Sequence, residues 1–310
     1  MSPIGAELLG DAGAAAASPE DFFRSPAFLA AEAVTHTLRI GDGVELPVIV
    51  RDVPGTDAQD AISPYGYPGA SVRADAVPVD PADVDWPATG LVSAFIRDRI
   101  GGSPCFAGAT ERSHVQVHDP DRPRAIRPRL AEQIRANERG GLVVECAPGP
   151  DAAPTQRAGF IRAYDETMRR ASAAERYFYS AAYFEAILAF DRSWLILATT
   201  GADIAAGAIA AVSDAVLHYY LGGTADAHRR ESPFKNVVAR MLDLADELGI
   251  PLNLGGGLRP GDGLERFKRG FANAELPFRT HELVLDPVAY ERLSRSAGPV
   301  PGFFPAYRNA

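Results

Sequence analysis

Residues 215–271 read AVLHYYLGGTADAHRRESPFKNVVARMLDLADELGIPLNLGGGLRPGDGLERFKRGF, and this stretch decides the fold. It begins with an apolar run rich in strand formers, which ends at two glycines and predicts a buried strand. From Phe234 to Leu248, apolar residues recur at the i, i+3, i+4, i+7 spacing of an amphipathic helix, and Gly249 ends that helix. A second short apolar run, 250–254, predicts another buried strand. A strand, a helix and a strand in this order form a crossover unit that joins two neighbouring parallel strands of one sheet.

The same stretch contains HYYLGGT at 218–224, NLGGG at 253–257 and FKRGF at 267–271. Two more segments lie upstream, SPYGYPG at 63–69 and YDETMRR at 164–170. In this order the segments resemble the Fem-type aminoacyltransferases, which belong to the wider N-acetyltransferase-like (GNAT-like) superfold. The upstream pair resembles the family's N-lobe glycine loop and the helical segment between its lobes.

The resemblance implies an α/β (α+β) fold with two GNAT-like lobes and a cleft between them. Each lobe would be a mixed, mostly antiparallel twisted sheet flanked by helices. Residues 147–154 are rich in Pro, Gly and Ala, which indicates the hinge between the lobes. We therefore expect a flexible tail over residues 1–17, an N-terminal lobe over 18–150 and a C-terminal lobe over 151–310.

Three local patterns describe the expected N-terminal lobe. Ser18 followed by Pro19 is a helix-start signature, with serine as the N-cap. Two strand-like runs, 35–40 and 45–50, are divided by glycines and predict a hairpin. Residues 88–100 have helical periodicity and predict a helix.

The composition is that of an ordinary globular protein, with 46% hydrophobic and 23% charged residues. The net charge of −9 argues against a general nucleic-acid binder, because the surface as a whole repels polyanions. The N-terminus lacks the positive start and apolar core of a secretory signal. The apolar stretch 193–212 is interrupted by a turn signal at 199–203, so it predicts a hairpin rather than a membrane helix. We therefore expect a cytoplasmic protein.

The cysteine and histidine spacings argue against a disulfide, a nucleophile pair and a shared metal ion. Cys105 and Cys146 lie far apart without a CxxC spacing, which is typical of buried small residues. His114 and His118 fall in an alternating segment that predicts a strand. On a strand they would be about 13 Å apart at ~3.3 Å per residue. That is too far for one ion, so no metal site is predicted.

Acyl transfer to an amine requires a positioned carbonyl, donors or a cation for the developing oxyanion, and a route for the amine proton. No GxSxG nucleophile elbow is present, which favours direct attack without a covalent intermediate. Lys268 is one of only two lysines. The resemblance implies that Lys268 stabilises the charge built up in transfer, and Phe267 before it would cover its stem. The resemblance also places a catalytic tyrosine at Tyr219 or Tyr220, which point to opposite sides of a strand, so that only one of them faces the site.

Two residues of the second predicted strand and its glycine loop are candidates for substrate binding. Asn253 lies at the C-terminal end of that strand, where ligands of open α/β sheets bind. Gly256 in the glycine run lets the backbone approach a ligand closely.

Two other loops supply further candidates for substrate binding. Tyr65 and Tyr67 lie in the N-lobe glycine loop, where they are placed to line a ligand groove. Residues 120–128 form a basic loop punctuated by prolines. Its Arg124 and Arg127 are candidates for gripping a phosphate-bearing donor.

The donor is inferred from a missing glycine motif in the segment between the first predicted strand and the helix that follows it. CoA-dependent acetyltransferases usually carry a glycine-containing pyrophosphate loop between strand and helix, but residues 224–232 contain no glycine. There is no Walker loop and no dinucleotide fingerprint, and no cofactor is expected. The resemblance implies aminoacyl-tRNA as the donor. An acidic protein would contact only the acceptor end of that tRNA, through a small arginine patch such as residues 122–129.

The acceptor is inferred from departures from the peptidoglycan enzymes of the family. Their N-lobe loop usually carries Arg-Gly-Pro, whereas residues 67–71 read YPGAS, and no long charged helical pair is present to form their coiled arm. These departures make a small-molecule amine, such as a specialised metabolite, plausible beside a peptidoglycan precursor. The sequence thus predicts an amide-forming aminoacyltransferase. Two alternatives stay open: an acyl-CoA-dependent N-acyltransferase, and a non-catalytic binding protein with the same fold.

Overall fold

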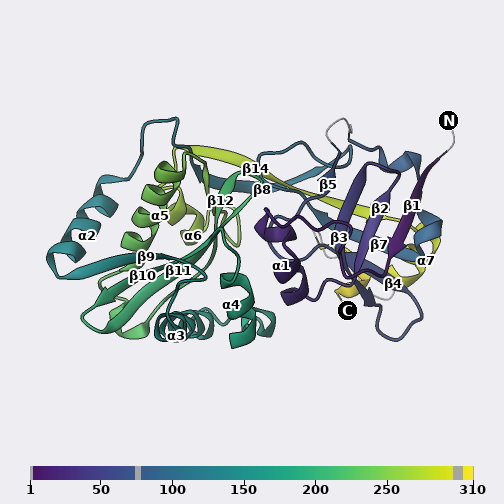
Figure 1. Cartoon of the computed structure of the whole chain (residues 1–310). Coiled ribbons are helices and arrows are strands. Elements are labelled where there is room, and N and C mark those ends of the chain that lie inside the picture. The colour runs from purple at the N-terminus through teal and green to yellow at the C-terminus, as the bar shows by residue number, and fades with distance from the viewer. Residues whose placement is uncertain (1–2, 74–77, 296–302, 310) are drawn as a thin grey trace. The chain divides into compact units, whose positions relative to one another are not determined.

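The computed structural model describes residues 3–73, 78–295 and 303–309 (Figure 1). The chain divides into two compact units. The first unit consists of Met1–Pro19, Phe23–Ser113 and Pro277–Ala310, and the second of Glu20–Phe22 and His114–Leu276. The first unit is therefore built from both ends of the chain, and the second mainly from its middle.

The two units do not follow the boundary expected at residue 150. The chain passes from one unit to the other within β8 (Thr110–His118) and again within β14 (Ala274–Val284). The Pro- and Gly-rich residues 147–154 lie inside the second unit, where they connect β9 (Leu142–Pro148) to α3 (Pro154–Arg170). A segment rich in Pro and Gly predicts a turn. It cannot predict a domain boundary, because the boundary depends on whether later residues return to the first unit.

The first unit contains one mixed sheet with the strand order β6-β1-β2-β3-β4-β7-β14, and β5 pairs with β3. The strands not yet given are β1 (Ile4–Leu9), β2 (His36–Ile40), β3 (Val44–Asp52), β4 (Gln59–Ile62), β5 (Ser71–Val72), β6 (Val84–Asp85) and β7 (Leu91–Arg97). Only the β1–β6 and β4–β7 pairs are parallel. The β2–β3 pair is the hairpin predicted over residues 35–50. Helices α1 (Pro26–Ala31) and α7 (Pro287–Ser294) belong to this unit, and α7 packs on β7.

Of the flexible tail expected over residues 1–17, residues 3–17 are instead an ordered part of the first unit, and residues 1 and 2 lie outside the described residues. Its residues 6–9 pair with 37–40 across the β1–β2 ladder. The carboxylate of Asp11 then accepts the N–H groups of Gly13 and Ala15 and the hydroxyl proton of Thr37. These bonds hold an alanine-rich segment that shows no periodicity of its own.

Two predicted helices of the N-terminal lobe are also corrected. The helix expected from Ser18 begins later, after Ser25, whose hydroxyl accepts the N–H of Phe28. The helix expected over residues 88–100 is instead strand β7, which lies between β4 and β14. A strand that is buried on both faces carries apolar residues without alternation, so its pattern resembles that of a buried helix.

In the second unit six strands lie side by side in the order β8-β13-β12-β11-β10-β9. The strands not yet given are β10 (Ser193–Thr200), β11 (Asp203–Ser213), β12 (Val216–Thr224) and β13 (Leu252–Gly255). Only β12 and β13 pair in parallel, and α5 (Phe234–Leu248) connects them. The crossover unit predicted from residues 215–271 is thus confirmed. The β10–β11 pair is the hairpin predicted within residues 193–212.

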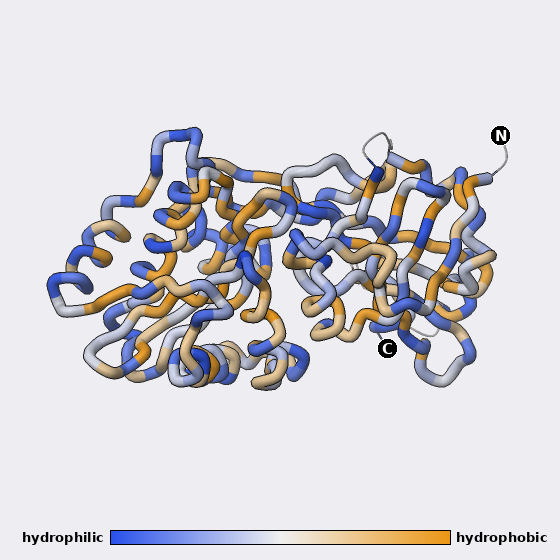
Figure 2. Tube along the Cα trace, in the orientation of Figure 1, coloured by the Kyte–Doolittle hydropathy of each residue, from blue (hydrophilic) through white to orange (hydrophobic). Residues whose placement is uncertain are grey.

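Helices cover both faces of this second sheet. Figure 1 shows α2 (Pro128–Arg139) and α5 on one face, and α3 and α4 (Ala181–Leu188) on the other. Hydrophobic and hydrophilic residues alternate along α5 (Figure 2), and its apolar side faces the sheet. Within the described part of the chain, none of the helices combines the length and hydrophobicity that a membrane crossing requires.

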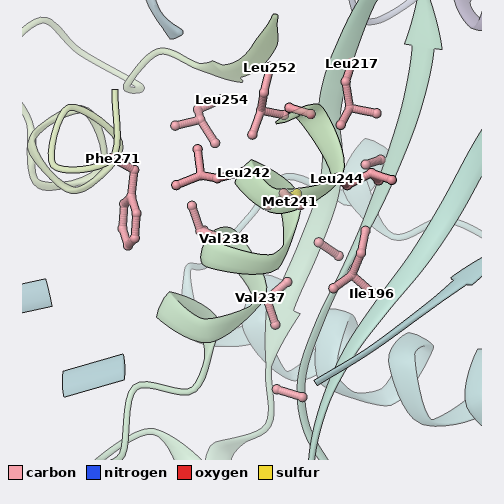
Figure 3. Close-up of a cluster of buried hydrophobic side chains, with 14 of the residues drawn as sticks. Ile196, Leu217, Val237, Val238, Met241, Leu242, Leu244, Leu252, Leu254 and Phe271 are labelled. Carbon is pink, nitrogen blue, oxygen red and sulfur yellow. The ribbon is translucent and has the colours of Figure 1, made fainter. Parts of the chain in front are cut away.

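The core of the second unit lies between α5 and the sheet (Figure 3). Val237, Met241 and Leu242 of α5 are fully buried there against strand residues such as Leu217 and Leu252. Each such side chain contributes roughly 1.5–3 kcal/mol by leaving water. The parallel strands β12 and β13 are therefore held firmly beside each other at their N-terminal ends.

A glycine allows α3 to pack closely on the opposite face. A Cβ atom at Gly223 would lie 2.5 Å from the carbonyl oxygen of Ala163 and 2.6 Å from Cα of Tyr164. Real Cβ atoms do not approach backbone that closely, so only glycine fits at this position. The second glycine of the HYYLGGT segment thus has a packing role.

Candidate active site

The candidate site lies where the two parallel strands of the second unit separate. Strands β12 and β13 pair only at Leu217 with Leu252 and at His218 with Asn253. The next residue of β12 is Tyr219, and β13 ends shortly afterwards at Gly255. Ligands of open α/β sheets bind beyond the carboxyl ends of parallel strands. The divergence of β12 and β13 places Tyr219 and the glycine loop at such a position.

The loop after β13 is fixed by a capping residue. Gly255 has a φ of 78°, in the left-handed region that glycine adopts freely. The carboxylate of Asp262 accepts the N–H groups of Leu258, Arg259 and Glu265, and so caps α6 (Gly263–Lys268). Because these bonds lock the loop to the helix, they also fix where the last residue of α6, Lys268, points.

Lys268 is a buried cation with few partners. Its side chain is only 9% exposed, and its Nζ donates to the carbonyl oxygen of Gly256 at 2.8 Å. The same Nζ lies 5.5 Å from the ring centroid of Tyr219. Burial lowers the pKa of Lys268 to about 8, an effect that the charge of Asp262 partly offsets. An ammonium in this environment acts more strongly on a nearby charge than one in water.

Tyr219 belongs to a row of aromatic rings beside Lys268. Its ring centroid is 5.6 Å from that of Phe234, which is 6.4 Å from that of Phe267. Gly222 leaves room for this row, because a Cβ there would lie 2.7 Å from the Tyr219 hydroxyl and 2.8 Å from the Phe234 ring. The first glycine of the pair therefore sets the position of Tyr219. Phe267 lies in this apolar row, and its ring also packs against that of Phe271.

Tyr220 belongs to a different environment. Between β11 and β12 the register shifts so that Ala210 pairs with Tyr219 and Ile209 with Leu221, which leaves Tyr220 as an extra residue at a β-bulge. The Tyr220 hydroxyl is hydrogen-bonded to that of Tyr183 on α4. Of the two candidate tyrosines, Tyr219 is the one that lies beside Lys268.

Asn253 uses its side-chain amide within the protein. Its Nδ2 donates to Nδ1 of His218 at 3.1 Å, and its Oδ1 accepts the N–H of Gly255 at 2.8 Å. His218 in turn contacts the carbonyl oxygen of Ser213 at 3.3 Å, a contact in which Nε2–H is the donor. Burial lowers the pKa of His218 to about 4, so this imidazole is neutral near pH 7. The pair fixes the start of the glycine loop, and the one ring proton of the neutral His218 is held in its bond to the Ser213 carbonyl oxygen.

The basic loop is tied to the helices of the same unit. Arg124 forms ion pairs with Asp243 at 2.6 Å and with Asp246 at 3.5 Å, both on α5. The Arg127 guanidinium donates to the carbonyl oxygen of Arg266, and the Arg127 N–H donates to that of Gly270. Both arginines therefore hold the loop against α5 and α6, and the charge of Arg124 is largely neutralised.

The loop that carries Tyr65 and Tyr67 lies in the first unit and is held by arginines. Arg24 donates to the carbonyl oxygen of Pro68, and Arg97 donates to that of Ser63. The Tyr65 ring is exposed, whereas the Tyr67 ring packs edge-on against those of Phe23 and Phe278. The loop is thus an ordered structure that presents one exposed tyrosine.

The connection between β12 and α5 is folded on itself. The N–H of Lys235 donates to the Ser232 carbonyl oxygen, and the N–H groups of Asn236 and Val237 donate to that of Pro233. These three N–H groups at the start of α5 are therefore already bonded within the chain and are not free to cradle a pyrophosphate.

Three residues of the site were not foreseen from the sequence. Asp262 could have been found from the sequence, because an aspartate followed three positions later by a glutamate, Glu265, matches the capping box that predicts a helix start. Phe234 was expected only as a core residue of α5, and Gly222 only as the end of a strand. Their closeness to Tyr219 depends on the crossover geometry, which no local pattern contains.

Comparisons with known proteins agree with this architecture. Residues 124–269 match the model of the acetyltransferase (GNAT) domain. The C-terminal domain of a protein described as a lysylphosphatidylglycerol synthetase, from Agrobacterium fabrum, is similar in fold, with a TM-score of 0.62 at 14% identity over 94% of this chain and 98% of that one. FemX gives a TM-score of 0.59 at 12% identity over 83% and 89% of the two chains. L-PGS from Bacillus licheniformis gives 0.57 at 11% identity over 87% and 91%. No curated protein matches the chain in sequence.

Proposed function

Because residues 124–269 carry an acetyltransferase (GNAT) domain, we propose that this acyltransferase forms amide bonds by passing an aminoacyl group from aminoacyl-tRNA to an amine. The acceptor would be a small-molecule amine or a peptidoglycan precursor. One observation carries the proposal: the buried ammonium of Lys268 lies beside Tyr219, where β12 and β13 separate. Within the described residues, its one hydrogen-bond acceptor is the Gly256 carbonyl oxygen.

Lys268 supplies what the transition state of acyl transfer needs. An ammonium has three N–H groups, and Gly256 accepts one of them. The others are available to the carbonyl oxygen of the donor as negative charge develops on it. The amine then forms the C–N bond, the C–O bond to the tRNA ribose breaks, and the amine proton ends on the leaving ribose oxygen. The ring of Tyr219 holds the cation in place and excludes water from one side.

The choice of donor is supported by the connection before α5. The N–H groups of Lys235, Asn236 and Val237 at the start of α5 are bonded within the chain, which leaves fewer donors to cradle the pyrophosphate of CoA. The resemblance to Fem-type enzymes implies aminoacyl-tRNA instead. The arginines at 124 and 127 hold their own loop in place, so the contact with tRNA would be small. A small contact agrees with the net charge of −9, which disfavours a broad polyanion interface.

The first experiment compares the two donor classes directly. The purified chain is titrated with acetyl-CoA by calorimetry and, separately, with a mixed pool of charged tRNA by gel shift at a fixed, moderate salt concentration, because phosphate contacts weaken steeply with salt. Binding of charged tRNA but not of uncharged tRNA supports aminoacyl transfer. Tight binding of acetyl-CoA alone overturns the choice of donor and makes the protein a CoA-dependent acyltransferase.

The second experiment tests catalysis itself. Transfer of labelled amino acids to a panel of amines is followed by mass spectrometry for the natural chain, for Lys268→Ala and for Lys235→Ala. Loss of one stabilising donor for the oxyanion should lower kcat about 10²–10³-fold in Lys268→Ala. The only other lysine, Lys235, serves as the matched control and should retain activity. Equal activity in both variants would leave a binding protein with this fold as the better description.

A further inference from the structure

A second cluster of reactive side chains lies in the first unit. Asp98 directly follows β7, Cys105 lies in the connection to β8, and His281 is on β14, which pairs with β7. The three residues are buried, with relative exposures of 4%, 6% and 2%. The buried Phe106 ring packs at a steep angle against the His281 ring, with the two centroids 5.2 Å apart. A buried group of this composition requires an explanation.

The ligand atoms of the cluster converge. Nε2 of His281 is 3.0 Å from Oδ2 of Asp98, and Sγ of Cys105 is 3.4 Å from Oδ1 of Asp98. One donor atom from each residue can be chosen so that all three lie within 4.8 Å of one another. Zinc bonds of about 2.0–2.3 Å at tetrahedral angles separate neighbouring ligand atoms by roughly 3.3–3.6 Å. The three side chains are therefore close to the spacing of one zinc ion's ligands.

The charge of the cluster also favours a cation. A buried carboxylate needs a compensating positive charge. In the described part of the chain, no lysine or arginine forms an ion pair with Asp98. Its side-chain partners are Cys105 and His281, and His281 compensates the carboxylate only when the imidazole is protonated. One divalent cation would balance the Asp98 carboxylate and a Cys105 thiolate together. The mixed set of sulfur, nitrogen and oxygen ligands is one that zinc accepts.

A nucleophilic role for the cysteine fits the arrangement poorly. Asp98 lies between Cys105 and His281, whereas a nucleophilic triad needs the histidine between the other two. Burial, followed by the charge of Asp98, raises the pKa of the Cys105 thiol well above its usual value.

We propose that Asp98, Cys105 and His281 bind one Zn²⁺ ion, which joins the end of β7 and the following connection to β14 in the first unit. On binding, the thiol loses its proton to solvent and forms the Zn–S bond, and the imidazole coordinates through Nε2 in its neutral form. Three protein ligands leave one position of a tetrahedral ion for water. The proposal does not depend on the reaction assigned to the second unit, because all three ligands belong to the first unit.

The cysteine content of the chain offers a matched control. Cys105 and Cys146 are its two cysteines, and Cys146 is a half-buried residue of the second unit. The full chain, with either Cys105→Ser or Cys146→Ser, is expressed in zinc-supplemented medium and purified without chelators. Metal analysis should find about one zinc per chain in the natural protein and in Cys146→Ser, and a loss of at least about 10–100-fold in zinc affinity in Cys105→Ser. Zinc-free natural protein that gains no zinc on dialysis against Zn²⁺ would overturn the proposal.

Two further readouts remain decisive even if Cys105→Ser fails to fold. Natural protein stripped by a chelator should unfold at a temperature roughly 5–10 °C lower and should recover on addition of Zn²⁺. Replacement of zinc by Co²⁺ in Cys146→Ser, where Cys105 is the sole thiol, should give a thiolate-to-cobalt charge-transfer band in the near ultraviolet. An unchanged melting temperature together with no such band would show that hydrogen bonds alone hold the cluster.

Discussion

Lys268 lies over the ring of Tyr219, with its Nζ 5.5 Å from the ring centroid. The two residues come from different elements, α6 and β12, which the crossover brings to one edge of the sheet. The face of an aromatic ring attracts a cation without neutralising it. The ammonium therefore keeps its full charge in a site where burial has removed most of its water.

The activity should depend on the protonation of Lys268. Because burial lowers the pKa of this group to about 8, kcat/KM should fall as the pH rises above about 8 and the ammonium loses its proton. Lys268→Arg should be slower but should lack this falling limb, because a guanidinium stays charged up to pH 12. The measurement is a pH–rate profile of both proteins. An identical limb in the two would assign it to another group.

The buried charge of Lys268 should also destabilise the folded protein, a penalty that is accepted where the group serves a function. Its pKa is about 8 in the folded protein and 10.5 in a free lysine, so the unfolded state binds more protons between these values and stability rises with pH there. At pH 7 the full penalty is present. Lys268→Met should therefore raise the free energy of unfolding at pH 7 by up to about 3 kcal/mol while it abolishes transfer.

The readout for this variant is chosen to report on the second unit alone. Trp86 lies in the first unit and Trp194 in the second, and these are the two tryptophans of the chain. Urea unfolding in a Trp86→Phe background, followed by fluorescence, thus reports on Trp194. Lys235→Met in the same background is the control and should change stability by less than about 0.5 kcal/mol. A less stable Lys268→Met protein at pH 7 would contradict the prediction.

Gly222 should control activity through Tyr219. A methyl group at this position would meet the Tyr219 hydroxyl and the Phe234 ring, and it would move both by several tenths of an ångström. Gly222→Ala should therefore lower kcat at least about 10-fold, at a cost in stability of roughly 1–3 kcal/mol from overpacking. Gly263→Ala is the control, since a Cβ there meets nothing within 4 Å. Full activity in Gly222→Ala would remove Tyr219 from the catalytic arrangement.

His218 should make the second unit sensitive to acid. Its pKa is about 4 in the folded protein because of burial, against 6.5 for a free imidazole. Between these values the unfolded state binds the extra proton, so stability is lost as the pH falls from about 6.5 towards 4. The loss should approach about 3 kcal/mol. Unfolding of His218→Gln at pH 7 and pH 4.5 should show a smaller difference than the natural chain, and an equal difference would place the titrating group elsewhere.

The crossover unit was predictable because its information is local. Glycines end each element, and the apolar spacing of residues 234–248 specifies one helix. The choice between Tyr219 and Tyr220 was not predictable, because it depends on a β-bulge created by the pairing with β11. Strand β7 was mistaken for a helix, since a strand buried on both faces loses the alternation that marks a strand.

The division into units was hidden for a different reason. The last strand of the first unit, β14, comes some 180 residues after β7, with which it pairs, so the boundary depends on a contact distant in sequence. The prolines and glycines of residues 147–154 mark a real turn, but they carry no information about such a return. Tyr307, near the C-terminus, is buried in a hydrophobic cluster with Val53 and Val92 of the first unit, another contact distant in sequence.

That C-terminal contact yields the last prediction. Asp60 on β4 is completely buried, and the Arg308 guanidinium contacts its two carboxylate oxygens at 2.5 Å and 3.0 Å. Arg51 binds the same carboxylate from β3, and the Tyr307 hydroxyl donates to it at 3.1 Å. Removal of one partner of a buried pair leaves uncompensated charge, so Arg308→Ala should lower the free energy of unfolding by about 3–5 kcal/mol. The loss should be smaller to the extent that Arg51 still compensates the Asp60 carboxylate.

The matched control is Arg295→Ala, which breaks an exposed pair with Glu291 on α7 and should cost less than about 0.5 kcal/mol. Both variants are unfolded in urea in a Trp194→Phe background, so that Trp86 reports on the first unit. Asp60→Asn combined with Arg308→Ala should recover part of the loss, because the neutral amide no longer needs the guanidinium. Equal costs for Arg308→Ala and Arg295→Ala would show that Arg51 alone compensates Asp60, and that the C-terminus does not hold the first unit together.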